Sequence, residues 1–291
     1  MNDLLNKIEK ALDEYTSIPH SHYMDKVFEA MRYSLLDAGK RVRPMLTLLF
    51  AEAAGGSIEN AMPFALAVEM IHTYSLIHDD LPLMDDDDMR RGKPSNHIVY
   101  GEDIALLAGD GLLTLAFEAC LCEKAISAVG YEKAAKAALV LSKYAGVRGM
   151  VGGQCIDVMS AGKITRENEL FEMVSGKTVA LLKAASIMGV IAAGGNEKQV
   201  KAAEDYAQGL GMAFQIRDDI LDITGDPTTL GKNVGIDEKN DRFNYVSLYG
   251  LAGAQILVEQ FTDEAIKALD AFENSTLELK NYALKLINRE K

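Results

Sequence analysis

The sequence predicts an all-helical fold. Apolar residues recur at three- and four-residue spacing along nearly the whole chain, which is the period of an α-helix. Alternating, β-branched runs of the kind that form strands are scarce. With 48% hydrophobic and 25% charged residues, the 291-residue chain has enough apolar material for one large core. We expect residues 1–291 to form a single domain, because no internal repeat or composition break divides them.

Local signals mark where several helices begin and end. Gly55-Gly56 can close a helix over residues 44–54, and Asn196 followed by Gln199 resembles a capping pair that opens a later helix. Three long segments, at about 60–80, 102–129 and 167–193, are apolar on more than one face. We expect them to form the buried centre, with shorter mixed helices around them.

Two segments resist helix assignment, 81–97 and 225–244, because each contains proline and glycine. Each directly follows a cluster of aspartates. Loops in these positions can close over a site while the aspartates stay on rigid helix ends.

The net charge of −13, from 30 basic and 43 acidic residues, is concentrated rather than spread. Nine of the acids form two clusters: Asp79, Asp80, Asp85, Asp86, Asp87, Asp88 and Asp218, Asp219, Asp222. This concentration indicates local cation binding and disfavours nucleic acid as a partner.

Cellular location can be predicted from the cysteines and the N-terminus. Cys120, Cys122 and Cys155 show no zinc-type pair and are typical of thiols in a reducing cytosol. Residues 1–15 alternate acids and lysines, so they lack the apolar centre of a signal peptide. No uncharged stretch reaches the roughly 18 residues that suggest a membrane span. We expect a cytoplasmic protein without stable membrane insertion.

The second aspartate cluster has the spacing of a cation site. Asp218 and Asp222 are four residues apart, so a helix brings both carboxylates onto one face. Like charges repel there, and a divalent cation between them would explain the pattern. Oxygen-only ligands favour Mg²⁺ or Ca²⁺. A solvated acidic face is the alternative.

The first cluster needs a break in the helix. Asp79 and Asp85 are six residues apart, a separation that a regular helix sends to different faces. Pro82 predicts a bulge after Leu81 that brings Asp85 back beside Asp79. Residues 86–88 then point toward solvent or toward the basic residues that follow.

Basic residues follow both clusters: Arg90, Arg91 and Lys93 after the first, and Lys232 after the second. Aspartates, a metal ion and basic side chains together describe a diphosphate site, because the cations neutralise both carboxylate and phosphate charge. Either cluster alone fits a solvated helix face equally well, but two clusters with basic neighbours do not.

Two further candidates lie upstream. Lys40 and Arg43, in GKRVRP (residues 39–44), precede a helix start that suits anions, although an exposed basic face is the alternative. His72 lies seven residues before Asp79 and therefore shares its face of the helix. It is either a core residue or a donor to a substrate phosphate.

These motifs resemble the trans-isoprenyl diphosphate synthase family, in particular its bacterial farnesyl and geranylgeranyl diphosphate synthases. The resemblance spans nearly the whole chain. It is carried by GKRVRP, EMIHTYSLIHDDLPLMDDDDMRRGKP, GDGLLTLAFE, GGQCIDV, Lys177-Thr178, and FQIRDDILDITGD followed by LGKNVGIDEK. It implies a helical bundle around a central cavity and a homodimer.

The resemblance also implies roles for individual residues. About three Mg²⁺ ions would be held against the allylic diphosphate by Asp79, Asp80, Asp85, Asp218, Asp219 and Asp222. The same leaving group would be shared by Lys177, Lys232 and Arg90. The diphosphate of isopentenyl diphosphate would be bound by Lys40, Arg43, His72 and Arg91. Oxygen dipoles for the developing allylic cation would come from Thr178 and Gln215.

The implied reaction is physically coherent. Metals and fixed cations neutralise the departing diphosphate without proton transfer, and the allylic cation is then attacked by the double bond of isopentenyl diphosphate. The released diphosphate would take the proton. We expect no covalent enzyme intermediate and no organic cofactor.

Product length should depend on the floor of an apolar tunnel beneath the first cluster. Tyr74, five residues before Asp79, is the candidate plug, with Ser75 beside it. In similar enzymes a bulky aromatic here accompanies the fifteen-carbon farnesyl product, and a smaller side chain permits twenty carbons. Farnesyl diphosphate is therefore the expected product and geranylgeranyl diphosphate the alternative.

The chain departs from the family after LGKNVGIDEK. A Lys-Ser/Thr-Thr-Tyr pattern is usual there, and this chain has DRFNYVSL at residues 241–248. Tyr245 remains, and Arg242 can supply a similar charge, but the role of this loop stays open.

Two other functions compete. A class I terpene cyclase also uses an aspartate-rich helix end but lacks a second substrate pocket. A non-catalytic synthase subunit would be expected to lose metal-binding aspartates. The basic residues and the two intact clusters favour chain elongation over both.

Overall fold

A computed structural model describes residues 1–37, 39–160, 164, 166–224 and 243–287. It confirms the predicted all-helical fold: within these ranges the strands are two residues each, paired antiparallel with Met89 opposite Pro94. In chain order the elements are α1 (Asn2–Thr16), η1 (His22–Met24), α2 (Asp25–Leu35), α3 (Val42–Ala53), α4 (Ile58–Asp79), β1 (Met89–Arg90), β2 (Lys93–Pro94), α5 (Asn96–Tyr100), α6 (Glu102–Leu121), α7 (Glu123–Val129), α8 (Tyr131–Ala145), α9 (Met150–Ser160), α10 (Glu167–Val174), η2 (Ser175–Val179), α11 (Ala180–Ala193), α12 (Glu197–Thr224), α15 (Tyr245–Ala268), η3 (Leu269–Ala271) and α16 (Leu277–Ile287).

Helices α4 and α11 form the predicted buried centre. Every residue from Ala61 to Ile71 of α4 is buried, because this stretch is apolar around nearly its whole circumference. Helix α4 packs against α3, α6 and α11, and α11 packs against α3, α8 and α12. Each large aliphatic or aromatic side chain buried here contributes about 1.5–3 kcal/mol.

The other two long apolar segments are each interrupted. Segment 102–129 divides into α6 and α7 at Cys122, whose backbone is extended. Segment 167–193 is widened at η2, a π-helical turn. By length and composition, Glu102–Val129 and Glu167–Ala193 could cross a membrane, and 44% and 67% of their apolar windows are buried inside the bundle. Such burial is typical of core helices.

The capping signals are confirmed with small shifts. Asn196 and Gln199 form a reciprocal pair, each side-chain oxygen accepting from the other's backbone N–H at 3.0 Å. Helix α3 begins two residues earlier than the sequence suggested, with Arg41 as its N-cap, and it ends before the Gly55 pair.

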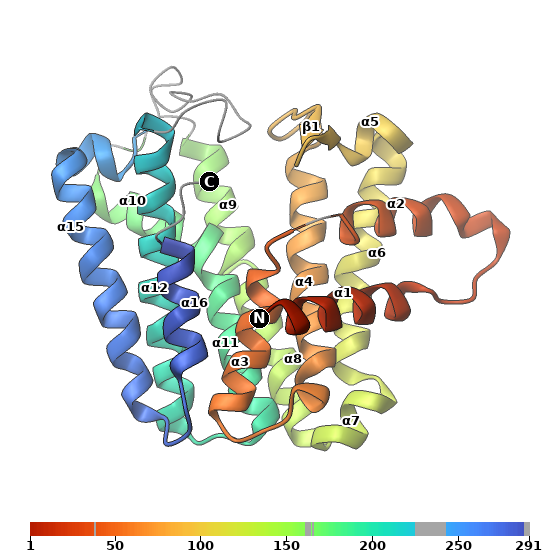
Figure 1. The fold of residues 1–291 in the computed structure, drawn as a ribbon. Helices are drawn as coiled ribbons and strands as arrows, with labels where there is room; N and C mark the ends of the chain where they lie inside the picture. The colour runs from red at the N-terminus through yellow and green to blue at the C-terminus, as the bar shows by residue number, and fades with distance from the viewer. Residues whose placement is uncertain (38, 161–163, 165, 225–242, 288–291) are drawn as a thin grey trace.

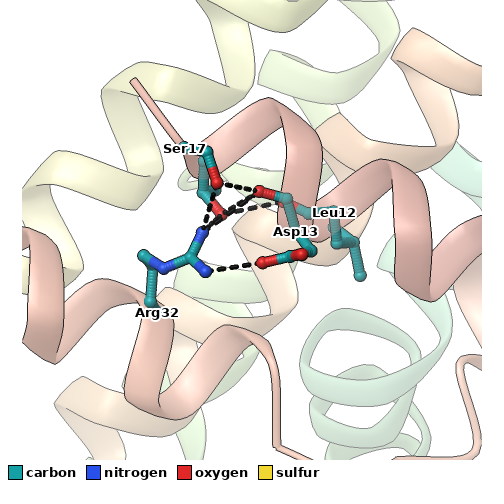
Figure 2. Close-up of polar contacts among 5 residues, drawn as sticks. Leu12, Asp13, Ser17 and Arg32 are labelled. Carbon is teal, nitrogen blue, oxygen red and sulfur yellow. Dashed lines mark hydrogen bonds and ion pairs between the residues drawn. The ribbon is translucent and has the colours of Figure 1, made fainter. Parts of the chain in front are cut away.

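The N-terminal helix α1 is tied to α2 by an arginine. Figure 2 shows the Arg32 guanidinium reaching the last turn of α1, where it donates to the carboxylate and backbone carbonyl of Asp13 and to the hydroxyls of Thr16 and Ser17. A cation in this position donates hydrogen bonds to carbonyl groups at the C-terminal end of a helix and is favoured by the helix dipole. The contact fixes how α1 lies across the bundle (Figure 1).

The helices that carry the two aspartate clusters finish at the same end of the molecule. In Figure 1, α4 and α12 both reach the upper end, where the β1–β2 hairpin follows α4. The fold therefore places at one end of the molecule acids that lie about 140 residues apart in the sequence (Figure 1).

Candidate functional site

The first aspartate cluster has the predicted bulge. The backbone N–H of Asp85 donates to the carbonyl oxygen of Asp79 at 2.8 Å, so the chain turns back on the helix end after Leu81. Asp85 is exposed, whereas Asp80 is buried and receives a bidentate ion pair from Arg90. Asp87 also contacts Arg90, at 3.4 Å, as expected for the acids beyond the bulge.

Asp79 carries an unfavourable charge in this setting. Burial raises its pKa to about 6, and the charges of Asp85 and Asp80 act in the same direction. Lys177 and Arg90 oppose this rise in pKa. The Nε2 of Gln154 donates to Oδ1 of Asp79 at 2.9 Å. Burial also raises the pKa of Asp80, against the effect of Arg90.

The π-helical turn η2 presents Lys177 and Thr178. It lies directly against α9: a Cβ on Gly153 would sit 2.0 Å from the backbone nitrogen of Lys177, so only glycine permits this approach. The approach lets the Lys177 ammonium pair with Asp157 of α9. Single π-turns of this kind are frequent at functional sites because they redirect side chains.

The second cluster is linked to the first through this turn. Thr178 donates to Oε1 of Gln215 at 3.2 Å, and Nε2 of Gln215 donates to Asp219 at 3.1 Å. Asp219 also accepts the backbone N–H of Tyr245 at 3.0 Å. Asp222 is buried as well, and the other member of the cluster, Asp218, is half-buried. η2 thus carries Lys177, whose charge acts on Asp79, and Thr178, which reaches the second cluster through Gln215.

The donor set fits a divalent cation. In the part of the chain that the structure describes, no three histidine, cysteine, aspartate or glutamate side chains already converge as a metal site. Asp79 nevertheless has two carboxylate neighbours that raise its pKa, and a cation would relieve that repulsion. The available donors are carboxylate and amide oxygens, which suit Mg²⁺ or another hard ion.

Arg43, Arg91 and His72 of α4 form a basic cluster, in which the charged side chains affect one another's pKa values. Burial and the nearby charge of Arg91 lower the pKa of Arg43 to about 10, and Glu69 partly offsets this. Burial, Arg43 and Arg91 hold the pKa of His72 well below its usual value, so its ring is neutral at pH 7. A Cβ on Gly39 would sit 2.7 Å from the Arg91 guanidinium. The loop that carries the exposed Lys40 therefore lies against Arg91.

Tyr74 is buried, as a tunnel plug would be. Only 7% of the residue is exposed, and its ring meets that of His78 edge to face, with centroids 5.6 Å apart. Ser75 turns its hydroxyl to the carbonyl of His72 at 2.8 Å. The apolar tunnel itself stays a prediction.

Some expectations lie outside the described residues. Lys232 falls there, as do Asp241 and Arg242 at the start of the divergent stretch. The chain is described again over residues 243–287, where Asn244 caps α15 in a capping box with Ser247.

Sequence reasoning missed three residues that the structure ties to the site: Gln154, Asp157 and Arg41. The first two lie three residues apart in GGQCIDV, and their spacing on one helical face was an available signal. Arg41 stands between the two basic residues that were chosen, and nothing local distinguishes it from them.

The fold and the site define a helical protein whose two acidic helix ends lie beside basic side chains, an arrangement that suits a diphosphate with bound cations. The chain belongs to the polyprenyl synthetase family, whose sequence pattern matches residues 24–281. It is 44% identical over 268 residues to a chloroplastic geranylgeranyl pyrophosphate synthase of Capsicum annuum, covering 92% of this chain and 71% of that one.

Solved structures agree with this membership. Geranylgeranyl pyrophosphate synthetase from Pyrococcus horikoshii Ot3 matches with a TM-score of 0.89 at 32% identity, over 99% of both chains. An FPP/GFPP synthase from Zymomonas mobilis matches with a TM-score of 0.84 at 30% identity, over 99% of this chain and 95% of that one.

This membership establishes the class of activity. The protein is a prenyltransferase that elongates prenyl chains, with the helical-bundle fold of isoprenyl diphosphate synthases. Enzymes of this family bind the diphosphate of their substrates through divalent metal ions. The sequence-based expectations of fold, family and reaction are confirmed.

Proposed function

We propose that this prenyltransferase condenses isopentenyl diphosphate with dimethylallyl and then geranyl diphosphate to give farnesyl diphosphate, with about three Mg²⁺ ions at the two aspartate clusters. The observation that carries the proposal is the position of Asp79. The charges of Asp80, Asp85 and Lys177 all act on the Asp79 carboxylate. The basic cluster includes His72, which lies on the same helix.

The protein's own residues divide the work. Bound Mg²⁺ would supply Lewis-acid neutralisation of the departing diphosphate, held by Asp79, Asp80, Asp85, Asp218, Asp219 and Asp222. Lys177, Arg90 and Lys232 add fixed positive charge to the same group. Thr178 and Gln215, which are hydrogen-bonded to each other, orient oxygen dipoles toward the developing cation.

The basic cluster, together with Lys40, would hold the second substrate. Lys40, Arg43 and Arg91 bind the diphosphate of isopentenyl diphosphate, and the neutral His72 can donate one N–H to it. Holding this substrate near the allylic carbon supplies proximity, since the attack would otherwise be bimolecular. The departed diphosphate accepts the proton lost from the adduct.

Product length follows from Tyr74, with Ser75 beside it. Its ring is buried and packs against His78, and an aromatic side chain in this position would limit extension of the product beneath the first cluster. Geranylgeranyl diphosphate is the second candidate, because the Capsicum annuum relative carries that name.

Product analysis tests the proposed reaction and the proposed product length. Purified protein is incubated with isopentenyl diphosphate, dimethylallyl diphosphate and Mg²⁺, with a chelator control, and the products are separated by chromatography. We expect a fifteen-carbon product that requires Mg²⁺, and a longer product from Tyr74→Ala. Tyr131→Ala, at an exposed tyrosine, is the matched control and should change nothing. A twenty-carbon wild-type product would reject the Tyr74 assignment, and no condensation with either starter would reject the proposed function.

We also propose a cytoplasmic homodimer. Helices α5 and α6 expose a run of apolar side chains, Ile98, Val99, Leu106 and Leu107, between 46% and 51% exposed. Sedimentation analysis would reveal a dimer, and Leu107→Glu should weaken it. A monomer that is fully active would contradict this assembly.

A further inference from the structure

We propose that Arg41 is a positioning residue for the isopentenyl diphosphate site: it holds the loop of residues 39–43 so that Lys40 and Arg43 face the substrate. The inference rests on the proposed assignment of those two residues. Arg41 itself points the other way, into the protein, and would not contact substrate.

The Arg41 side chain is fully buried and joins α1 to α4. Its Nε and Nη2 atoms donate to the two carboxylate oxygens of Glu9, at 2.7 and 3.0 Å, in a bidentate ion pair with α1. Its Nη1 donates to Oε1 of Glu69 on α4 at 2.9 Å. Glu69 is only 2% exposed, so this second pair is buried. Two-point pairing fixes the plane of the guanidinium as well as its distance.

The same guanidinium also holds the end of α2. Nη2 donates to the backbone carbonyls of Leu35 at 2.8 Å and Asp37 at 3.0 Å, just where the chain leaves α2 for the loop. One side chain therefore connects α1, the end of α2 and α4. The loop starts from a point that is fixed on three sides.

The backbone of Arg41 supplies the link to the substrate side. Arg41 is the N-cap of α3 and adopts a left-handed conformation, φ 47° and ψ 42°. This conformation is unfavourable for a residue with a Cβ, so the buried contacts of the side chain must maintain it. Lys40 directly precedes this left-handed residue, and Arg43 follows it in the first turn of α3. Rotation at Arg41 would redirect both.

Glu69 extends the effect to charge. Its carboxylate pairs with Arg41 and also favours the charged form of Arg43, against the opposing effects of burial and of Arg91. The buried charge of Glu69 thus offsets part of the repulsion between Arg43 and Arg91.

The test compares two arginines that both anchor α1. Arg41→Lys keeps the positive charge but cannot reach Glu9, Glu69 and two carbonyls at once. We expect the Kd for isopentenyl diphosphate, by isothermal titration, and its KM to rise about tenfold, while KM for geranyl diphosphate stays within about twofold. Arg32→Lys, at the arginine of Figure 2, should leave all three values unchanged. Thermal unfolding confirms that each variant is folded.

A second variant covers the case in which Arg41→Lys does not fold. Glu9→Gln leaves the buried pair of Arg41 with Glu69 intact and removes only the charge on α1, and we expect the Kd for isopentenyl diphosphate to rise about threefold.

The outcomes separate this inference from the function on which it rests. If Lys40→Ala and Arg43→Ala weaken isopentenyl diphosphate binding while folded Arg41→Lys and Glu9→Gln do not, Arg41 has no positioning role. Equal rises in KM for both substrates would also overturn it, since they indicate general disruption. If Lys40→Ala and Arg43→Ala leave the Kd unchanged, the assignment of the basic cluster itself has failed.

Discussion

The two aspartate clusters are built in opposite ways. At the end of α4, Asp79 is partly buried beside Asp80 and Asp85, and its pKa is raised to about 6, first by burial and then by the charge of these two neighbours. At the end of α12, Asp219 is buried but accepts two hydrogen bonds, from Gln215 and from the backbone of Tyr245. In the first cluster Arg90 pairs with Asp80, but Lys177 and Arg90 offset the charge of Asp79 only in part, whereas the second cluster uses part of its charge to hold α15.

This difference indicates separate duties. An uncompensated carboxylate group costs stability and is retained at functional sites for what it binds. A carboxylate that is hydrogen-bonded to a neighbouring helix contributes to stability whether or not a ligand is present. Substitutions in the two clusters should therefore change the free energy of unfolding in opposite directions, even where both reduce activity.

The largest effect is expected from Asp79→Asn. Loss of this charge should lower kcat/KM for condensation by about 10³-fold or more, because neutralisation of the leaving group depends on bound metal. Steady-state assays over a range of Mg²⁺ concentrations measure it. Activity within tenfold of wild type would remove Asp79 from the metal site.

The second largest effect is expected from Asp157→Asn, which removes the ion pair between α9 and Lys177 of η2. Without its carboxylate partner the Lys177 ammonium loses its orientation, and we expect kcat/KM for the allylic substrate to fall about tenfold. Lys177→Ala is the reference for complete loss. An increase would instead show that Asp157 competes with the substrate for Lys177.

The pH dependence of stability compares the clusters directly. The raised pKa of Asp79, about 6 against 3.8 in the unfolded chain, means that the folded protein keeps a proton that the unfolded chain releases. The free energy of unfolding of the metal-free protein should therefore decrease as the pH rises from about 4 to about 6. The loss is on the order of 1 kcal/mol, since the carboxyl is partly screened by solvent.

Matched variants sharpen this test. Urea unfolding at pH 7.5 with chelator should find Asp79→Asn more stable than wild type by about 1 kcal/mol, and Asp219→Asn less stable by about 1 kcal/mol. At pH 4.5 the Asp79→Asn protein should match wild type. The same sign for both variants at pH 7.5 would contradict the contrast between the clusters.

The smallest effect is expected from the hydrogen bond that joins η2 to α12. Thr178→Val keeps the shape but removes the donor to Gln215, and kcat should fall about threefold with KM values unchanged. Ser142→Ala, which removes an exposed hydroxyl bonded to the Leu139 carbonyl within α8, is the control. No change in kcat would mean that this link does not orient the catalytic dipoles.

Much of this protein follows from local sequence. The helical period, the Asn196 cap and the glycines after α3 each act on neighbours within about one turn, so they predict elements without knowledge of the fold. The bulge at the first cluster is equally local, because proline cannot continue the hydrogen bonding of a helix. The identity of the acids and their spacing were sufficient to predict a cation site.

Only the tertiary structure decided how these parts meet. The π-turn at Lys177 exists where two glycines let α9 and η2 touch, and the partners of Arg41 lie 32 residues before it and 28 residues after it. Such contacts form because packing brings distant segments together, and no periodicity within either segment encodes the partner. The sequence motifs therefore determine which chemical groups the site contains, whereas the orientation of these groups depends on burial and on contacts between helices.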